Sequence, residues 1–442
     1  MTVQLPFDQA HPLDVAPLLR QLQQDGVVHQ VRTAVGDQAW LVTGHEEVRR
    51  LLADDRLGRS HPDPDRAARL GQSVLFGGPM GNFDTEQADN ARLRSLLQPH
   101  SPLRISPRRL LPLAPWLWRF LRSSTAPVHL AGLTATAHLA ASATADFDAL
   151  RDDGVGAAMC DGGLLFTFLD ADHARARLRE LEPLRALGMR LPRTVMPAGA
   201  TRRFEPALAD GVAAAFLAED ERHVDPGALT SALTARIVAM GVDVRTGTEV
   251  HRLVPHGESW CAHTRGGDVV ADDVVVAGGA WSSRLVRDLG VRLPLVSGKG
   301  YSFSIHPSVM PRRPLYLSEA KVGCTPIGGR MRVAGTMELA GLDTGVNARR
   351  IDAVARSAQR FLFSPLQPRS DEWAGLRPMV PDGLPVIGPA GPAGLWLATA
   401  HSMLGVTLGP TTGRVLAEWM MLGRPSLDLD AFSPSRFVTA RH

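Results

Sequence analysis

Lysine is almost absent from this chain. Of its 442 residues only Lys299 and Lys321 are lysines, so arginine supplies nearly all of the positive charge, and the formal net charge is +3. The arginines alternate with acidic residues and form no basic block of the kind that marks a nucleic-acid surface. The sequence therefore predicts no nucleic-acid partner, and we attribute the arginine excess to composition bias.

Cysteines and long apolar runs are scarce as well. Cys160, Cys261 and Cys324 are too few and too scattered for a disulfide framework, and no pair has the spacing of a zinc site. No segment reaches the roughly 18 to 20 apolar residues that a membrane helix needs. The start of the chain, MTVQLPFDQAHPLD, has no signal-peptide pattern. We therefore expect a cytoplasmic protein with no transmembrane segment.

The first hundred residues predict a small, mainly helical segment. The stretch VAPLLRQLQQDGVVHQV is typical of an amphipathic helix that runs into a strand, and AWLVTG of a second strand. Two more helices are expected in HEEVRRLLADDRL and EQADNARLRSLLQPH. We therefore expect a first domain over residues 1–100.

The order of these elements resembles the amino-terminal end of bacterial cytochrome P-450 monooxygenases over about residues 10–100. In that family an ARLR-like helix carries a histidine and an arginine that meet the haem propionates. Arg92 matches the arginine, whereas Asn90 stands at the histidine position. The family also needs a cysteine thiolate in a glycine- and phenylalanine-rich loop, and AAMCDGG, SWCAHT and VGCTPI do not fit it. Haem binding is therefore not expected.

From Ser101 onward the pattern predicts an α/β (α+β) domain over residues 101–442. A tryptophan-rich helix comes first, DGGLLFTFLD predicts a strand, and VDPGALTSALTARIVAMG a helix with Asp225 as N-cap and Gly241 as its end. VDVRTG and TEVHRLV predict strands, and VVADDVVVAGGAWSSRL a buried strand that turns through two glycines into a helix. This alternation favours an α/β domain with a largely antiparallel substrate sheet attached.

Four segments of this region resemble the D-amino-acid dehydrogenase branch of the D-amino-acid oxidase superfamily. They are VVVAGGAWS, GKGYSF with RRPLYLSEAKV, GTMELAG, and WAGLRPMVPDGLPVIG with ATAHSMLGVTLGPTTG. The resemblance covers about 340 residues and implies an FAD-dependent oxidoreductase. It places FAD-side elements at about 220–290 and 380–425, and the substrate sheet at about 155–215 and 291–378.

The resemblance also implies a set of cofactor-binding positions. They comprise a strand residue near the adenine, the glycine turn after the buried strand, and the start of the last long helix. These residues are Val250, Gly278, Gly279, Ala280, Trp281, Ser402, Met403, Leu404, Gly405, Val406 and Thr407. A glycine turn admits backbone close to a ligand, and a helix start favours negative charge on the flavin ring. Ala400 and Ser402 depart from the family, in which glycines are typical, and are expected to crowd the ring.

Two residues are candidates for substrate binding. Arg377 matches the arginine with which the family holds the substrate carboxylate, and a guanidinium suits that task because it donates two parallel hydrogen bonds. Tyr301 matches a position on the substrate side, where its hydroxyl could bond the substrate. A buried structural tyrosine is the competing interpretation. No residue is assigned as acid or base, because hydride transfer from a neutral amine needs no strong protein base.

One expected motif is missing from the sequence. An FAD enzyme of this superfamily begins with a strand, a G-x-G-x-x-G turn and a helix, whose amides receive the pyrophosphate. FGGPMG at 76–81 has glycines at the wrong intervals, and AWLVTGHEEV has a single glycine after its strand. The chain therefore predicts a fusion of a cytochrome-like start with a dehydrogenase that lacks this unit.

Three functions are open at this point. The leading interpretation is oxidation of D-amino acids, or related amines, to 2-oxo acids by hydride transfer to FAD, with an electron acceptor other than oxygen. The missing dinucleotide-binding motif could impair this activity. The second is a non-catalytic or degenerate fusion protein, and the third, more remote, is a haem monooxygenase.

Overall fold

The chain forms two compact units. The computed structural model describes residues 3–4, 17–33, 38–44, 46–48, 50, 103–105, 110–156 and 159–437. One unit comprises Met1–Leu96 with Leu121–His129, and the other comprises Leu97–Phe120 with Leu130–His442. Asn90 and Arg92 lie outside the described residues, so the cytochrome-like helix and the boundary at residue 100 stay predictions.

The first unit contains a helix and a small sheet. Helix α1 (Pro17–Asp25) leads into β2 (Val28–Arg32), which pairs antiparallel with β3 (Gln38–Val42) and parallel with β1 (Val3–Gln4). The expected helix followed by two strands is confirmed here.

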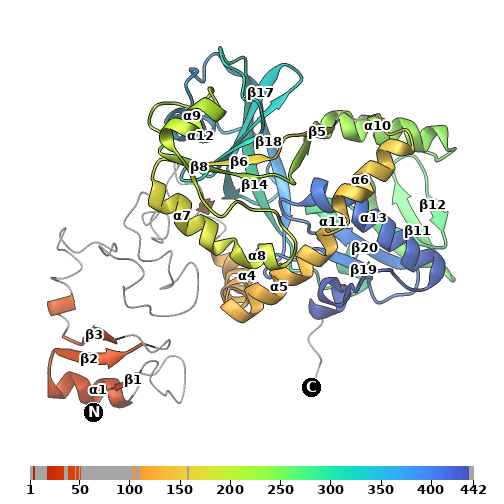
Figure 1. Ribbon diagram of the computed structural model, residues 1–442. Coiled ribbons are helices and arrows are strands. Elements are labelled where there is room, and N and C mark those ends of the chain that lie inside the picture. Colours follow the sequence, from red (N-terminus) through yellow and green to blue (C-terminus); the bar gives the residue numbers. More distant parts are fainter. Residues whose placement is uncertain are drawn as a thin grey trace. The chain divides into compact units, whose positions relative to one another are not determined.

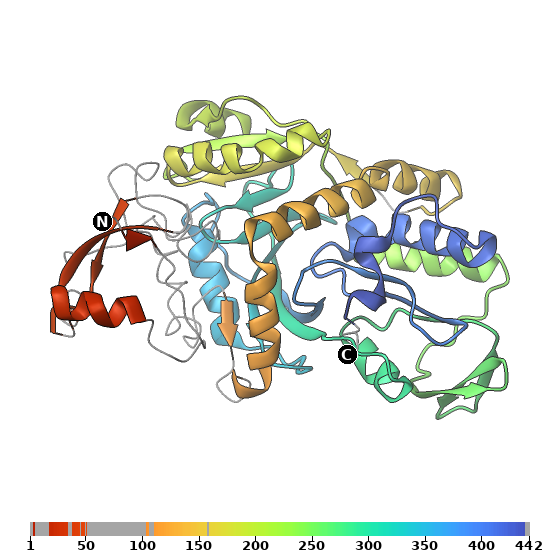
Figure 2. The ribbon, with the colours of Figure 1, turned by 90° about the horizontal axis from the view of Figure 1, so that it is seen from below.

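The remaining helices lie wholly or partly in the second unit (Figures 1 and 2). The α-helices are α4 (Leu110–Ser123), α5 (Ala126–Ala140), α6 (Ala143–Asp152), α7 (Ala171–Glu180), α8 (Glu182–Ala186), α9 (Ala198–Phe204), α10 (Pro226–Ala239), α11 (Ser282–Val286), α12 (Ala348–Gln359) and α13 (Gly405–Leu422). The short 3-10 helices are η5 (Gly279–Trp281), η6 (Arg287–Leu289), η7 (Asp430–Phe432) and η8 (Pro434–Phe437).

In the described part of the second unit, the strands form one large sheet and three small ones. The strands of the large sheet are β4 (Leu103–Ile105), β6 (Leu164–Phe168), β7 (Met196–Pro197), β8 (Ala214–Ala218), β14 (Val296–Ile305), β15 (Leu315–Leu317), β16 (Val322–Ile327), β17 (Arg330–Leu339) and β18 (Ser370–Met379). The others are β5 (Met159–Asp161), β9 (Arg222–Val224), β10 (Val250–His256), β11 (Ser259–Thr264), β12 (Val269–Ala271), β13 (Val274–Val276), β19 (Val386–Pro389) and β20 (Leu395–Thr399).

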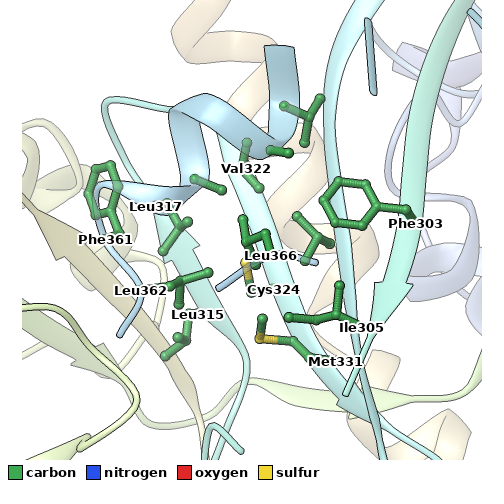
Figure 3. Close-up of a cluster of buried hydrophobic side chains, with 14 of the residues drawn as sticks. Phe303, Ile305, Leu315, Leu317, Val322, Cys324, Met331, Phe361, Leu362 and Leu366 are labelled. Carbon is green, nitrogen blue, oxygen red and sulfur yellow. The ribbon is translucent and has the colours of Figure 1, made fainter. Parts of the chain in front are cut away.

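The large sheet is rich in antiparallel pairs, as the sequence predicts. Its order is β18-β14-β17-β16-β15-β6-β8-β7, with β4 beside β17, and only the β15–β6 and β17–β4 pairs are parallel. Helix α12 packs on one face and closes the main core, part of which Figure 3 shows. The labelled core side chains are Phe303, Ile305, Leu315, Leu317, Val322, Cys324, Met331, Phe361, Leu362 and Leu366.

A smaller sheet, β13-β20-β19, forms the centre of the other half of this unit. Strands β13 and β20 are parallel, and α13 packs against β19 and β20. The meander β10-β11-β12 lies beside it and shares a core with β13 and β20. Helix α10 begins as predicted, with the Asp225 carboxylate accepting from the Gly227 and Ala228 amides, and Gly241 follows its end at φ +88°.

One predicted strand does not form. VDVRTG, at 242–247, contains no strand, and Val242 and Val244 are exposed. The prediction was wrong because alternating valines indicate a strand only where a neighbouring strand can accept its hydrogen bonds. No strand of the described residues pairs with this segment.

Candidate active site

The two glycine-containing segments predicted to touch FAD lie at one edge of the smaller sheet. Strands β13 and β20 run parallel, so the turn after β13 and the loop after β20 emerge side by side. The Thr399 hydroxyl donates to the Gly279 carbonyl at 3.2 Å, and the Ser282 and Thr399 hydroxyl oxygens lie 3.0 Å apart. In open α/β sheets, ligands bind beyond this carboxyl edge.

The turn after β13 leaves an aromatic side chain uncovered. Gly279 has φ +53°, a conformation that favours glycine, and opens η5. Ala280 is buried, whereas Trp281 is 46% exposed. Because η5 packs against β18, this turn lies next to the strand that carries Arg377.

The loop after β20 holds two residues in the left-handed region. Ala400 has φ +61° and Ser402 has φ +51°. The family's glycines at these two positions therefore have a backbone explanation, because glycine adopts this region without the cost of a side chain. The Ser402 amide donates to the Pro378 carbonyl at 3.1 Å, so the loop is fastened to β18 beside Arg377.

Helix α13 begins with exposed amides and exposed apolar side chains. No side chain caps its start at Leu404, so the partial positive charge of this 18-residue helix is available to a ligand. Met403 is 70%, Leu404 40% and Val406 43% exposed. Gly405 and Thr407 are exposed too. An apolar surface next to a positive helix end fits a flat ring that gains negative charge on reduction.

Arg377 lies on β18 with its guanidinium over the neighbouring strand. Arg377 pairs with Gly298 of β14 in the sheet register, and the side chain leans to Gly300. A Cβ atom placed on Gly300 would meet Nη1, Nη2 and Cζ of Arg377 at 2.2–2.4 Å. Nη1 also donates to the Thr336 carbonyl at 3.2 Å. The absence of a side chain at Gly300 therefore makes room for the guanidinium.

The charge of Arg377 lacks an acidic partner within the described part of the chain. Burial lowers the pKa of Arg377 from its usual value, which reflects the loss of hydration around the cation. Its hydrogen bond to Thr336 goes to a neutral carbonyl. A half-buried guanidinium without a carboxylate is chemically suited to bind an anion such as a substrate carboxylate.

Sequence reasoning missed the glycine face that surrounds Arg377. Gly298 and Gly300 alternate on β14, and Gly375 stands on β18, all on the face of the sheet that Arg377 occupies. The ring of Trp373 lies over Gly375, and Trp373 is itself 58% exposed. The signal was the repeat of glycine every second residue in GKG, which predicts a strand face without side chains.

Tyr301 faces the opposite side of the sheet. It follows Gly300 in β14, so its side chain points into the core under α12, where it is 1% exposed. Its hydroxyl donates to Glu338 Oε2 at 2.5 Å, and burial together with Glu338 raises the pKa of Tyr301. The structure does not bring Tyr301 and Arg377 together on one face.

Lys299 lies on the same face as Tyr301 and forms an ion pair with Asp343. Its ammonium donates to Asp343 Oδ2 at 2.7 Å and to the Gly345 carbonyl at 2.9 Å. This bond lowers the pKa of the Asp343 carboxyl. The two residues line a polar pocket of about 510 Å³ together with Glu338.

Val250 opens β10 and pairs with Thr264 of β11. Its side chain packs against the core that contains Val276 and Val286, so it belongs to the smaller-sheet half with the other predicted cofactor positions.

Comparison with known proteins shows the family of this chain. Residues 113–419 match the family described as FAD dependent oxidoreductase, DAO. The chain belongs to this family. It is 31% identical over 358 residues to a D-amino acid dehydrogenase of Rhizobium johnstonii, which covers 78% of this chain and 84% of the relative. It is 33% identical over 359 residues to that of Bradyrhizobium diazoefficiens, covering 78% and 83%.

Solved structures show the same fold. Glycine oxidase from Geobacillus kaustophilus has a TM-score of 0.63 and 25% identity, covering 72% of this chain and 85% of that chain. L-proline dehydrogenase from P. horikoshii has a TM-score of 0.60 and 18% identity, covering 69% and 83%. The predicted fold class, the oxidoreductase activity class and FAD as the cofactor are therefore confirmed.

The described residues contain no helix that is both long enough and apolar enough to cross a bilayer. The resemblance of residues 10–100 to cytochromes P-450 is supported by none of these comparisons and stays a prediction.

Proposed function

We propose that this oxidoreductase converts a D-amino acid, or a related amine, into a 2-oxo acid and ammonia. The substrate loses a hydride from its α-carbon and a proton from its nitrogen, and water hydrolyses the resulting imine. Bound FAD supplies the hydride acceptor. The observation that carries the proposal is the half-buried guanidinium of Arg377, which lies over Gly300 and has no carboxylate partner among the described residues, on a strand that packs against the η5 turn.

Arg377 binds and orients the substrate in this scheme. Its guanidinium donates two parallel hydrogen bonds to the carboxylate, which fixes the position of the α-carbon next to it. The Thr336 carbonyl holds the guanidinium from the far side, at 3.2 Å. Gly300 keeps the approach open, since any side chain there would occupy the same space.

The turn, the loop and the helix start form the flavin side of the site. We infer that Trp281, Met403 and Val406 cover the ring and exclude water, because all three present apolar surface at the carboxyl edge of the sheet. The amides at the start of α13 favour negative charge at the adjoining edge of the ring. These residues fit a flavin ring.

The phosphate end of the cofactor has no G-x-G-x-x-G turn in this sequence. We infer that FAD binds with reduced affinity, because a pyrophosphate normally receives several amide hydrogen bonds at that turn. The second candidate function, a protein that keeps the substrate sheet without catalysis, rests on this departure. We propose that the reduced flavin of this chain passes its electrons to an acceptor other than oxygen, as the resemblance to D-amino-acid dehydrogenases implies.

The visible spectrum of the purified chain tests these functions directly. A flavin spectrum that bleaches anaerobically with D-alanine or D-proline, and not with the L-enantiomers, would support the proposal. A flavin spectrum that bleaches only with L-amino acids would overturn the substrate assignment alone. A colourless protein that stays colourless with added FAD would favour the non-catalytic function, and an intense haem band would favour the monooxygenase.

A further inference from the structure

Three side chains of types that bind metals converge at one end of the β10-β11-β12 meander, and none of them belongs to the predicted cofactor or substrate residues. Cys261 and His263 are two residues apart on β11, and Asp268 comes from the turn before β12. Their ligand atoms, one from each residue, all lie within 4.8 Å of one another. We propose that Cys261, His263 and Asp268 bind a divalent transition-metal ion, with zinc as the preferred ion.

The backbone places the three side chains on one side of the meander. Residues two apart in a strand share a face, so Cys261 and His263 project together. Their even-numbered neighbours Trp260 and Ala262 project the other way, into the core shared with β13 and β20. The cluster therefore uses the outer face of the hairpin, where it does not compete with core packing.

The turn that carries Asp268 is held in place by its own hydrogen bonds. The Thr264 hydroxyl donates to the Gly267 carbonyl at 2.5 Å, and the Gly266 amide donates to the Thr264 hydroxyl oxygen at 3.1 Å. Asp268 Oδ1 lies 2.8 Å from His263 Nδ1, so the carboxylate already meets the imidazole. A ligand set on a short, braced hairpin needs little reorganisation to receive an ion.

The chemistry of the three groups favours zinc over calcium or magnesium. A thiolate and an imidazole are soft or borderline ligands, whereas calcium and magnesium prefer sets of oxygen atoms. Zinc bonds of about 2.0–2.3 Å imply ligand atoms roughly 3.3–3.8 Å apart in a tetrahedron. The ligand atoms now lie within 4.8 Å of one another, so they have to shift toward this spacing when the ion binds, and the 2.8 Å contact between His263 Nδ1 and Asp268 Oδ1 has to open if these two atoms are the ligands. Water takes the fourth position, and the thiol releases one proton to solvent when the zinc–sulfur bond forms.

The accessibility of the cluster fits a site that fills from solvent. Cys261 is 6% exposed, whereas the side chains of His263 and Asp268 are 32% and 54% exposed. The sulfur is thus shielded while the other two ligands reach water. Spacing between cysteines cannot reveal such a site, because only one ligand is a cysteine.

The site would fasten the end of the hairpin to which Val250 belongs. Val250 is the register partner of Thr264, which lies between His263 and the Asp268 turn. An ion that binds both His263 and Asp268 would cross-link strand β11 to the turn before β12. We therefore expect zinc to raise the thermal midpoint of the chain.

Zinc titration of the full chain tests the proposal. The purified, reduced and chelator-treated protein is titrated with zinc chloride in competition with a chromophoric chelator, and separately with cobalt chloride. We expect one ion per chain and a sulfur-to-cobalt charge-transfer band in the near ultraviolet. Cys261→Ser and His263→Ala should weaken zinc binding by at least about tenfold, on the scale seen for single partners in metal sites.

Cys160→Ser is the matched control. Cys160 is exposed and stands opposite His223 in the β5–β9 pair, but does not belong to the cluster. This variant should bind zinc like the parent chain. The proposal is wrong if the parent binds no zinc, if the cobalt complex lacks the sulfur band, or if Cys160→Ser and Cys261→Ser have equal effects. Circular dichroism of each variant separates loss of ligand from loss of fold.

Discussion

The guanidinium of Arg377 occupies the space in which a side chain of Gly300 would lie. The distance from an ideal Cβ of Gly300 to Arg377 Nη1 would be 2.2 Å, far inside van der Waals contact. Position 300 can therefore hold only glycine while the Arg377 guanidinium keeps this place, and the guanidinium can keep this place only while position 300 is glycine.

Gly300→Ala should therefore impair substrate binding. The added methyl group displaces the guanidinium from the sheet face, so we expect KM for a D-amino acid to rise by about tenfold or more, since 1.4 kcal/mol corresponds to a factor of ten. Steady-state kinetics with an artificial electron acceptor measures it. Gly323→Ala on β16 is the control, because its new Cβ would come no closer than 4.0 Å to its nearest neighbour. Equal effects of both substitutions would contradict the role of Gly300.

Arg377→Leu should lower kcat/KM by roughly a hundredfold or more, because losing one partner of a buried charge pair costs about 2–5 kcal/mol. Arg377→Lys should restore part of this loss, since lysine keeps the charge without the planar fork. Arg330→Leu, at the start of strand β17 and paired with Asp371, provides a control for removing an arginine from the sheet. Unchanged turnover of a D-amino acid by Arg377→Leu in a flavin-containing preparation would refute the assignment.

Ser402→Gly should stabilise the chain. Ser402 has φ +51°, and a glycine relieves this left-handed strain, for a gain of about 0.5–1 kcal/mol in the free energy of unfolding. Denaturant titration measures the change. Ala398→Gly, in the regular strand β20 two residues before the loop begins at Ala400, should have the opposite sign. A destabilising Ser402→Gly would mean that the serine side chain outweighs the strain.

Acid should weaken the fold through His401. Burial lowers the pKa of His401 from 6.5 to about 4, and its Nε2 lies 2.9 Å from the Thr412 hydroxyl. Between these values the unfolded chain binds more protons than the folded one, so stability falls as pH drops from about 6.5 toward 4. The contribution of neutral His401 to the stability of the fold is fully present above about pH 6.5.

Unfolding of His401→Gln should consequently depend less on pH in this window than that of the parent chain. Some dependence will remain, because burial also lowers the pKa of His223. His306→Gln, at an exposed position, is the control for replacing a histidine by glutamine. Superimposable profiles for the parent and His401→Gln would contradict the prediction.

Local sequence signals predicted the elements whose determinants lie within a few residues. Asp225 caps α10 through its own carboxylate, and Gly241 ends it with a positive φ, so both ends could be placed. The turn at Gly279 was also readable, because glycine is needed there wherever the rest of the chain goes. In contrast, the strand expected at 242–247 depends on a partner strand elsewhere, and sequence alone could not show that none of the described strands pairs with it.

The site divides in the same way. The resemblance pointed to Arg377 and to the segments around Gly279 and Ser402, and the structure shows both segments in contact with β18, the strand that carries Arg377. Tyr301 shows the limit, because adjacent residues of a strand face opposite sides and the motif GKGYSF does not say which side is buried. The register of β14 puts the glycines beside Arg377 and the tyrosine under α12.

Thr336 connects Arg350 of α12, beneath the large sheet, with Arg377 on its opposite face through hydrogen bonds. With φ +59° in β17, it offers its carbonyl to Arg377 and its hydroxyl to the fully buried Arg350 of α12. Two guanidinium groups on different elements therefore bond the same residue, one at its side-chain hydroxyl and the other at its backbone carbonyl. We therefore expect a displacement of α12 to reach Arg377 through Thr336, so that substitutions beneath the sheet alter the proposed substrate binding above it without contacting the ligand.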